Sequence, residues 1–268
     1  MSAHPPARPV YVDPGIPVWL DIEDGALVFR VAGKAARQVP LHWVSRLVLP
    51  EHAEMGLQAM CACARAGIPV VVMGETGEVV LRAVGHRPGE GDLRRRLSEL
   101  VARPGWRGML SDWVLSTRSR IGRIVQHRLS LGPGRLDAEE VAMAIERRAR
   151  SLAGDDLARR SARDLQAFCQ AWMHEVLLVH GIDGRTDEWL FDELDVASLL
   201  AGLMAFRLQP LRLGWLRRRH EWMRRKGTAR APVRYATLVR LFESNRGRVS
   251  RLGRDIINRF HRWLVEIA

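Results

Sequence analysis

The spacing of apolar residues changes near residue 86, and this change limits the chain to a fold in which strands come first and helices follow. Before it, apolar runs are short and separated by turn residues such as Glu23-Asp24-Gly25. After His86–Gly91 (HRPGEG), apolar residues recur every three or four positions, as in amphipathic helices. The sequence therefore predicts an α+β chain with a small N-terminal β-rich domain at 1–85, a linker at 86–91 and a large all-α domain at 92–268.

The β-rich part is expected to contain a small antiparallel sheet with hairpins, built from its first four apolar runs. A helix is predicted over Glu54–Ala66, followed by a buried strand at Ile68–Met73 and its partner at Val79–Val84. The expected strands before that helix are Pro9–Val12, Val18–Ile22, Ala26–Val31, Arg37–Leu41 and Arg46–Leu49.

The remainder of the chain is expected to be helical throughout. Pro133-Gly134 and Gly154-Asp155-Asp156 are clear helix breaks. The predicted helices are Asp92–Ala102, Trp106–Leu129, Asp137–Leu152, Asp155–Val179, Asp192–Phe206, Gln209–Lys226, Ala231–Asn245 and Arg248–Ile267.

Positive charge is concentrated at the end of the chain. The net charge is +12, and residues 207–268 carry 17 basic groups against 4 acidic ones, whereas residues 1–206 are close to balance. Nearly all of the basic groups are arginines, whose guanidinium binds phosphate through two parallel hydrogen bonds. This segregation predicts a polyanionic partner, with nucleic acid favoured over an anionic membrane because apolar positions interrupt the basic segment. The candidate nucleic-acid-binding residues are Arg217, Arg218, Arg219, Arg224, Arg225, Lys226, Arg248 and Arg251.

The chain is expected to be cytoplasmic and to have no membrane partner. Its start, MSAHPPARPV, lacks the apolar core of a secretory signal, and no apolar run is long enough to span a bilayer. Cys61, Cys63 and Cys169 are odd in number, and we interpret them as reduced core thiols.

An acidic cluster with one histidine is the candidate site for chemistry. Asp192 and Asp195 are spaced i, i+3 at the start of a predicted helix, so both carboxylates leave one face of a turn. His180 precedes Asp192 by twelve residues, and a loop of that length allows it to fold back beside the acids. A divalent cation would remove the repulsion between the carboxylates. The alternative is that the acids only complement the helix dipole and that His180 faces solvent.

The β-rich part contains Val39-Pro40-Leu41, then Leu47-Val48-Leu49, then a predicted helix and Gly67-Ile68-Pro69-Val70-Val71-Val72. In this order of features the chain resembles a known family, the CRISPR adaptation integrases, which comprises the first CRISPR-associated protein. In its helical domain this family carries a Glu, a His, a Gly-Arg turn and an Asp with a second acid three positions later. The matching positions here are Glu146, His180, Gly184-Arg185, Asp192 and Asp195.

The resemblance implies an enzyme that inserts spacer DNA into a CRISPR array by attack of a 3′-hydroxyl on a phosphodiester. It implies that Glu146, His180, Asp192 and Asp195 act as catalytic residues that hold Mg²⁺ or Mn²⁺, because the metal stabilises charge on the phosphorus oxygens. It also implies a homodimer formed through the β-rich domain, double-stranded DNA as substrate, and a complex with the small second CRISPR adaptation protein.

The sequence departs from the family pattern between its first acid and its histidine. Only 34 residues separate Glu146 from His180, fewer than in the family, so Glu139 or Glu140 is an alternative for the first acid. Another alignment equates the family's turn before the histidine with Gly181-Ile182-Asp183 and leaves the catalytic histidine deleted. The integrase is the leading hypothesis, and the alternative is a non-catalytic structural DNA-binding subunit whose metal site was lost with the shortened segment. An RNA-binding accessory protein is a third hypothesis, which rests on charge alone.

Overall fold

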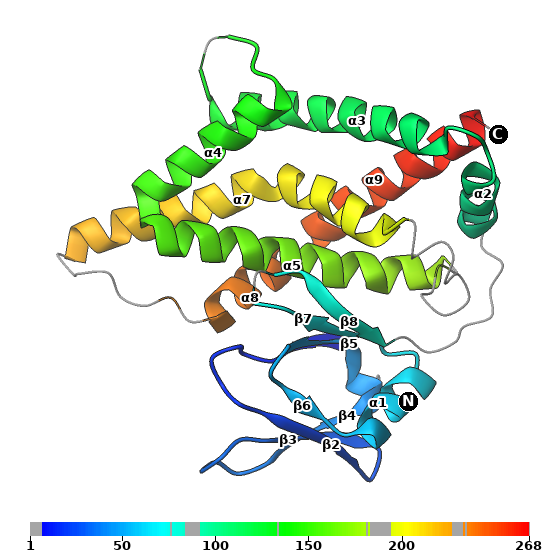
Figure 1. Ribbon diagram of the computed structural model, residues 1–268. Coiled ribbons are helices and arrows are strands. Elements are labelled where there is room, and N and C mark those ends of the chain that lie inside the picture. Colours follow the sequence, from blue (N-terminus) through cyan, green and yellow to red (C-terminus); the bar gives the residue numbers. More distant parts are fainter. Residues whose placement is uncertain are drawn as a thin grey trace, which may run out of the picture. The chain divides into compact units, whose positions relative to one another are not determined.

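The computed structural model describes residues 7–75, 77–83, 92–132, 134–180, 182, 194–226, 233 and 235–267. Strands come before residue 84 and helices dominate after residue 91, which confirms the predicted α+β class (Figure 1). Two compact units are formed, Met1–Arg94 with Gln170–Asp195 (unit 1) and Arg95–Cys169 with Val196–Ala268 (unit 2). Unit 1 thus takes in residues 170–195 as well, unlike the predicted β-rich domain at 1–85. The predicted linker at 86–91 lies outside the described residues.

Unit 1 contains two four-stranded sheets. One has the order β1-β5-β7-β8, from Arg8–Tyr11, Val44–Pro50, Val70–Met73 and Val79–Ala83. The other has the order β4-β3-β2-β6, from Arg37–Pro40, Ala26–Arg30, Trp19–Glu23 and Glu54–Met55. A short 3₁₀ turn, Leu41–Trp43, precedes β5.

The strand pairing differs from the prediction in one respect. The second, third and fourth runs form β2, β3 and β4, whose antiparallel pairing confirms the prediction, but β1 pairs with β5 in parallel and not with β2, so the prediction was wrong for the first run. The reason lies in β5, which is buried over almost its whole length and needs a neighbour on each edge; β1 and β7 both flank it in parallel. The predicted pairing of the strands around residues 70 and 80 is confirmed by β7 and β8, which run antiparallel.

Helix α1, Leu57–Arg65, contacts β2 and β7 and so packs against strands of both sheets. Its buried face carries Ala59 and Cys63, which join the core cluster, and it is followed by Gly67 in a left-handed conformation (φ 67°). Cys61 lies on the other face and is exposed, so the prediction that it is a core thiol was wrong. The core of unit 1 includes Leu20, Leu27, Val44, Leu47, Leu49, Ile68 and Val70.

The C-terminal part of helix α5, Asp155–Val179, belongs to unit 1 from Gln170 onward. Arg46 of β5 is fully buried and donates hydrogen bonds to the Glu175 carboxylate and the Tyr11 hydroxyl. Because a buried guanidinium is costly without partners, these contacts hold this part of α5 on the sheet of β1, β5, β7 and β8.

Unit 2 is helical, and α7 lies at its centre. Helix α7, Val196–Lys226, contacts α3, α4 and α9, whose bounds are Trp106–Leu129, Ala138–Ala153 and Arg246–Glu266. The remaining helices are α2 (Asp92–Val101), the first part of α5, and α8 (Tyr235–Ser244).

The two helices predicted at Asp192–Phe206 and Gln209–Lys226 form this single helix with Pro210 inside it, so that prediction was wrong. Leu208, Leu213 and Leu216 are buried on either side of Pro210, and this packing keeps the helix continuous despite the missing N–H. By length and hydropathy α7 could cross a membrane, but 56% of its apolar window is buried inside the protein, as in a core helix.

Candidate functional site

Glu146, the predicted first acid, lies on α4 and is paired with an arginine. Helix α4 starts with a capping box in which Asp137 accepts from the backbone N–H groups of Glu139 and Glu140, each at 2.8 Å. Val141, Ile145 and Ala149 form the buried face of α4. Glu146 is half-buried, and both of its carboxylate oxygens face the guanidinium of Arg212 on α7, at 2.6 Å and 3.1 Å.

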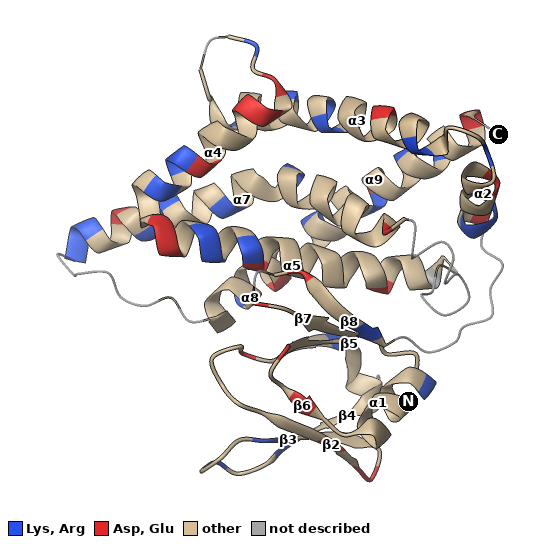
Figure 2. Ribbon diagram, in the orientation of Figure 1, with Lys and Arg blue, Asp and Glu red and all other residues tan. Residues whose placement is uncertain are grey.

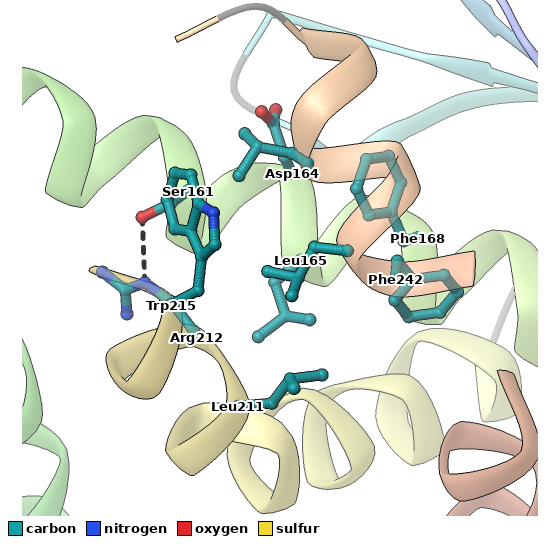
Figure 3. Close-up of a pocket in the computed structure, with 10 residues that line it drawn as sticks. Ser161, Asp164, Leu165, Phe168, Leu211, Arg212, Trp215 and Phe242 are labelled. Carbon is teal, nitrogen blue, oxygen red and sulfur yellow. Dashed lines mark hydrogen bonds between the residues drawn. The ribbon is translucent and has the colours of Figure 1, made fainter. Parts of the chain in front are cut away.

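Arg212 is only 2% exposed, and every part of its guanidinium has an acceptor. Its Nε donates to the Ser161 hydroxyl at 3.1 Å, the contact drawn in Figure 3. Its terminal nitrogens also donate to the Ala158 carbonyl at 2.7 Å and to the Gln209 side chain at 2.8 Å. Arg212 is thus a satisfied buried cation, and Glu146 is its counter-ion.

The two alternative first acids are engaged elsewhere. The Glu140 carboxylate accepts from the Asp137 backbone N–H at 2.8 Å, which completes the capping box. Glu139 is largely exposed and pairs with Arg118 at 3.2 Å. All three candidate acids on α4 therefore have a local or ion-pair role of their own.

Asp195 and His180 lie in unit 1. Asp195 accepts a hydrogen bond at 2.5 Å from Arg82 of β8. His180 follows the last residue of α5 and is exposed, and its backbone N–H donates to the Leu177 carbonyl. Asp192 and the predicted Gly184-Arg185 turn lie outside the described residues.

A histidine that sequence reasoning did not select lies beside this ion pair. His174 of α5 is 7% exposed, and its pKa is lowered to about 3, mainly by burial and also by the nearby charge of Arg82, while the charge of Asp195 opposes the shift. Within the described part of the chain its Nε2 has no hydrogen-bond partner. The spacing of His174 with Ala171 and Leu178 marks it as a residue of an apolar helix face. Its neighbour Arg82, distant in sequence, could not have been predicted.

The predicted metal ligands are distributed over both units, with Glu146 in unit 2 and with His180 and Asp195 in unit 1. Among the described residues, no group of three or more His, Cys, Asp or Glu side chains is arranged to hold a metal ion. Glu146 and Asp195 each face a guanidinium, whereas a divalent cation needs several oxygen ligands around it. At Glu146 and Asp195 a guanidinium therefore supplies the positive charge that Mg²⁺ or Mn²⁺ would supply.

The candidate nucleic-acid-binding residues lie on two helices of unit 2 (Figure 2). Six of them follow one another along the last turns of α7, where Arg217, Arg218 and the last three are exposed. Arg219 is partly buried, and this burial, together with the charge of Arg160, lowers its pKa. Arg248 and Arg251 lie near the start of α9. Arg128 of α3 and Arg207 of α7 lie near Arg248, a proximity that local sequence patterns do not indicate.

The chain is similar to proteins of one known family. A family model described as "CRISPR associated protein Cas1" matches residues 16–170, more than half of the chain. A structure of a CAS1 protein from Thermotoga maritima is similar, with 10% identity, 95% of this chain and 96% of that chain covered, and a TM-score of 0.66.

Two further solved structures share the fold. A casposase bound to an integration product has 7% identity, coverage of 94% and 89% and a TM-score of 0.59. TtCas1 has 15% identity, coverage of 90% and 94% and a TM-score of 0.52. At identities this low, the structural similarity establishes a common fold and nothing more. A search of curated proteins found no match.

Proposed function

This chain belongs to the Cas1 family of CRISPR-associated proteins, and we propose that it acts in spacer acquisition by binding double-stranded DNA on the arginine-rich surface of unit 2. The observation that carries this proposal is the excess of 17 basic over 4 acidic residues in 207–268, a segment that supplies α8, α9 and the basic end of α7. Guanidinium groups in such numbers bind phosphates with little dependence on sequence and with strong dependence on salt. The casposase that shares this fold was solved bound to an integration product.

Cas1 is a family of DNA integrases and nucleases, so strand transfer is the second candidate function. In it, a DNA 3′-hydroxyl would attack a phosphodiester of the CRISPR repeat, with Glu146, His180, Asp192 and Asp195 as the residues of the site. A bound Mg²⁺ or Mn²⁺ would supply stabilisation of the charge that develops on the phosphate oxygens. What favours this candidate is the family match, and what opposes it is the arginine beside each of two predicted ligands.

We favour the structural DNA-binding function over the catalytic one because of these two arginines. Arg212 already supplies the charge that a metal ion would supply to Glu146, and Arg82 does the same for Asp195. A metal ion that used either carboxylate would have to displace the guanidinium, and for Arg212 this would leave a cation that is 2% exposed without its counter-ion.

A strand-transfer assay distinguishes the two functions. Labelled duplex DNA with free 3′-hydroxyls is incubated with supercoiled plasmid and Mg²⁺ or Mn²⁺, with and without the second adaptation protein, and binding of the same duplex is measured in parallel. We expect salt-dependent binding without joining. Metal-dependent joining that Asp192→Ala abolishes would establish the integrase function instead, and an absence of DNA binding at low salt would refute both.

The family also suggests an assembly. We propose a homodimer formed through the near-neutral β-rich residues 1–85, in complex with the small second CRISPR adaptation protein, in the cytoplasm. A native mass measurement that gave only the monomer would contradict the dimer.

Preference for RNA over DNA of equal length at equal salt would favour the RNA-binding hypothesis.

A further inference from the structure

A row of arginines follows one face of α9 in unit 2. Arg248, Arg251, Arg259 and Arg262 are spaced three, eight and three residues apart, with Asp255 between the middle two, so all lie on the same side of the helix. Arg120 and Arg128 of α3 and Arg207 of α7 lie beside this face. We call the set the arginine seam, made of Arg120, Arg128, Arg207, Arg248, Arg251, Arg259 and Arg262.

Among the residues that the structure describes, most guanidinium groups of the seam have no carboxylate paired with them. Nη1 of Arg207 is buried and has no hydrogen-bond acceptor among the described residues. Within the same part of the chain, no carboxylate pairs with Arg128, Arg248 or Arg251. The carboxylate of Asp255 lies within the row, and it accepts from Nε of Arg259 at 3.2 Å. The seam therefore holds more positive charge than its own acids can neutralise.

The guanidinium groups are close enough to repel one another. Burial lowers the pKa of Arg207, and the charges of Arg128, Arg259 and Arg248 lower it further, while Asp255 opposes the shift. Burial and the charge of Arg128 likewise lower the pKa of Arg248. A fold that keeps several like charges together with a single nearby carboxylate stores repulsion that a bound anion would relieve.

The start of α9 adds to the positive potential at this end of the seam. Its first turn contains no acidic residue, and Asn245 at its N-cap makes no side-chain cap. The partial positive charge of the helix N-terminus is therefore not compensated by the helix's own side chains. Arg248 lies in that first turn, so an anion bound there would be stabilised by both the dipole and the guanidinium.

At its other end the seam opens into a pocket between α3 and α9. This pocket has a volume of about 430 Å³ and is lined by Arg120, Arg259 and Arg262. Ser116, Thr117, Trp113 and Trp263 also line it, and Glu266 is the one acid among the described residues that do so. From Arg248 to Arg262 the helix rises about 21 Å. That length corresponds to about six phosphates of one strand of duplex DNA.

We propose that the arginine seam is the binding track for the phosphate backbone of a DNA strand. The proposal rests on the DNA-binding function proposed above and assigns it to a particular face of unit 2. A row of this length fits a polymer of phosphates better than a single small anion, because its unpaired arginines extend along several helical turns. The track differs from the predicted basic run at 217–226, and it includes Arg120, Arg128 and Arg207, which lie outside the residues selected from the sequence.

Fluorescence anisotropy with labelled duplex DNA, measured in the full-length protein from about 50 to 300 mM NaCl, tests the proposal. Arg207→Gln and Arg248→Gln should each lower the slope of log affinity against log salt by about one, and the double variant by about two. Each single variant should bind roughly fivefold or more weakly at the lower salt concentrations. The matched control is Arg254→Gln, because Arg254 is exposed on another side of α9 and donates to the Ser250 carbonyl of its own helix. It should leave the slope unchanged.

Thermal stability separates loss of binding from loss of folding. Removal of one guanidinium relieves repulsion, so Arg248→Gln should melt at the same or a higher temperature than wild type while it binds DNA less well. Weaker binding together with a lower melting temperature would make the seam a structural feature and overturn the proposal. If wild type binds DNA and the seam variants retain its slope, the track is wrong but the DNA-binding function stands. If wild type does not bind DNA at all, the proposed function itself fails.

Discussion

Substitution of Arg212 by Met is expected to lower the free energy of unfolding by about 3 kcal/mol. The structure sets this magnitude. Removal of one member of a buried ion pair costs about 3–5 kcal/mol. Glu146, the partner left behind, has a side chain that is 37% exposed and can regain water, which places the cost at the lower end. Methionine keeps most of the aliphatic stem, so the loss reports mainly on the hydrogen bonds and the charge.

Urea unfolding followed by circular dichroism measures this change, with the m-value unchanged if the native state keeps its surface. At about 2–4 °C for each kcal/mol, the melting temperature should fall by roughly 6–12 °C. Glu146→Leu should cost at least as much, because it leaves the buried cation of Arg212 unpaired. The double variant should recover part of both losses, since two apolar residues remove the pair without leaving a charge behind.

A matched control exists on the same face of α4. Arg118 and Glu139 form a pair in which both side chains are well exposed, so Arg118→Met should cost less than about 1 kcal/mol. If Arg212→Met behaves like this control, Arg212 is not the counter-ion of Glu146. If millimolar Mg²⁺ raises the melting temperature of wild type but not of Glu146→Leu, the carboxylate holds a metal ion, and the argument against the metal site is refuted.

Three further predictions concern local features. Asp137→Ala removes the cap of α4 and should cost about 1 kcal/mol in urea unfolding, whereas a loss under about 0.3 kcal/mol would show that the capping box does not stabilise the helix. Cys61 should react quickly with a thiol reagent at about pH 8, while Cys63 should be protected, because burial raises its pKa to about 11; equal rates for both would contradict this. The free energy of unfolding should fall as the pH is lowered from about 6.5 to about 3. In this range the unfolded chain binds a proton at His174, whereas the folded chain, in which the pKa of His174 is about 3, does not. His174→Gln should flatten this dependence, and an unchanged slope would show that other groups cause it.

Much of the architecture could be predicted from local spacing. The order of strands and helices, the pairing of the strands around residues 70 and 80, and the break at Gly154 all depend on residues that are close in sequence. The pairing of β1 with β5 could not be predicted in this way. It joins Val10 to Leu47, and a strand's choice between two edges depends on the burial of the whole sheet. The continuity of α7 through Pro210 likewise depends on packing against other helices.

Glu146 and Asp195 show what a pattern of carboxylates leaves open. The sequence reveals that Glu146 and Asp195 need a cation, but it does not reveal which cation. Arg212 lies 66 residues from Glu146 and Arg82 lies 113 residues from Asp195, so neither partner belongs to a motif around its acid. A bidentate guanidinium and a divalent metal ion both compensate carboxylate charge, and only the three-dimensional neighbourhood distinguishes them.

The arginine seam differs from Arg212 and Arg82 in that most of its guanidinium groups are not paired with acids among the described residues. Arg212 and Arg82 are paired with acids, so their charge is neutralised within the protein. Arg128, Arg207 and Arg248 have no such acid among the described residues, so their charge is available to a ligand. A net charge of +12 does not distinguish these two kinds of arginine, but pairing does. If DNA is the partner, salt dependence should therefore follow the unpaired arginines, and stability should follow the paired ones.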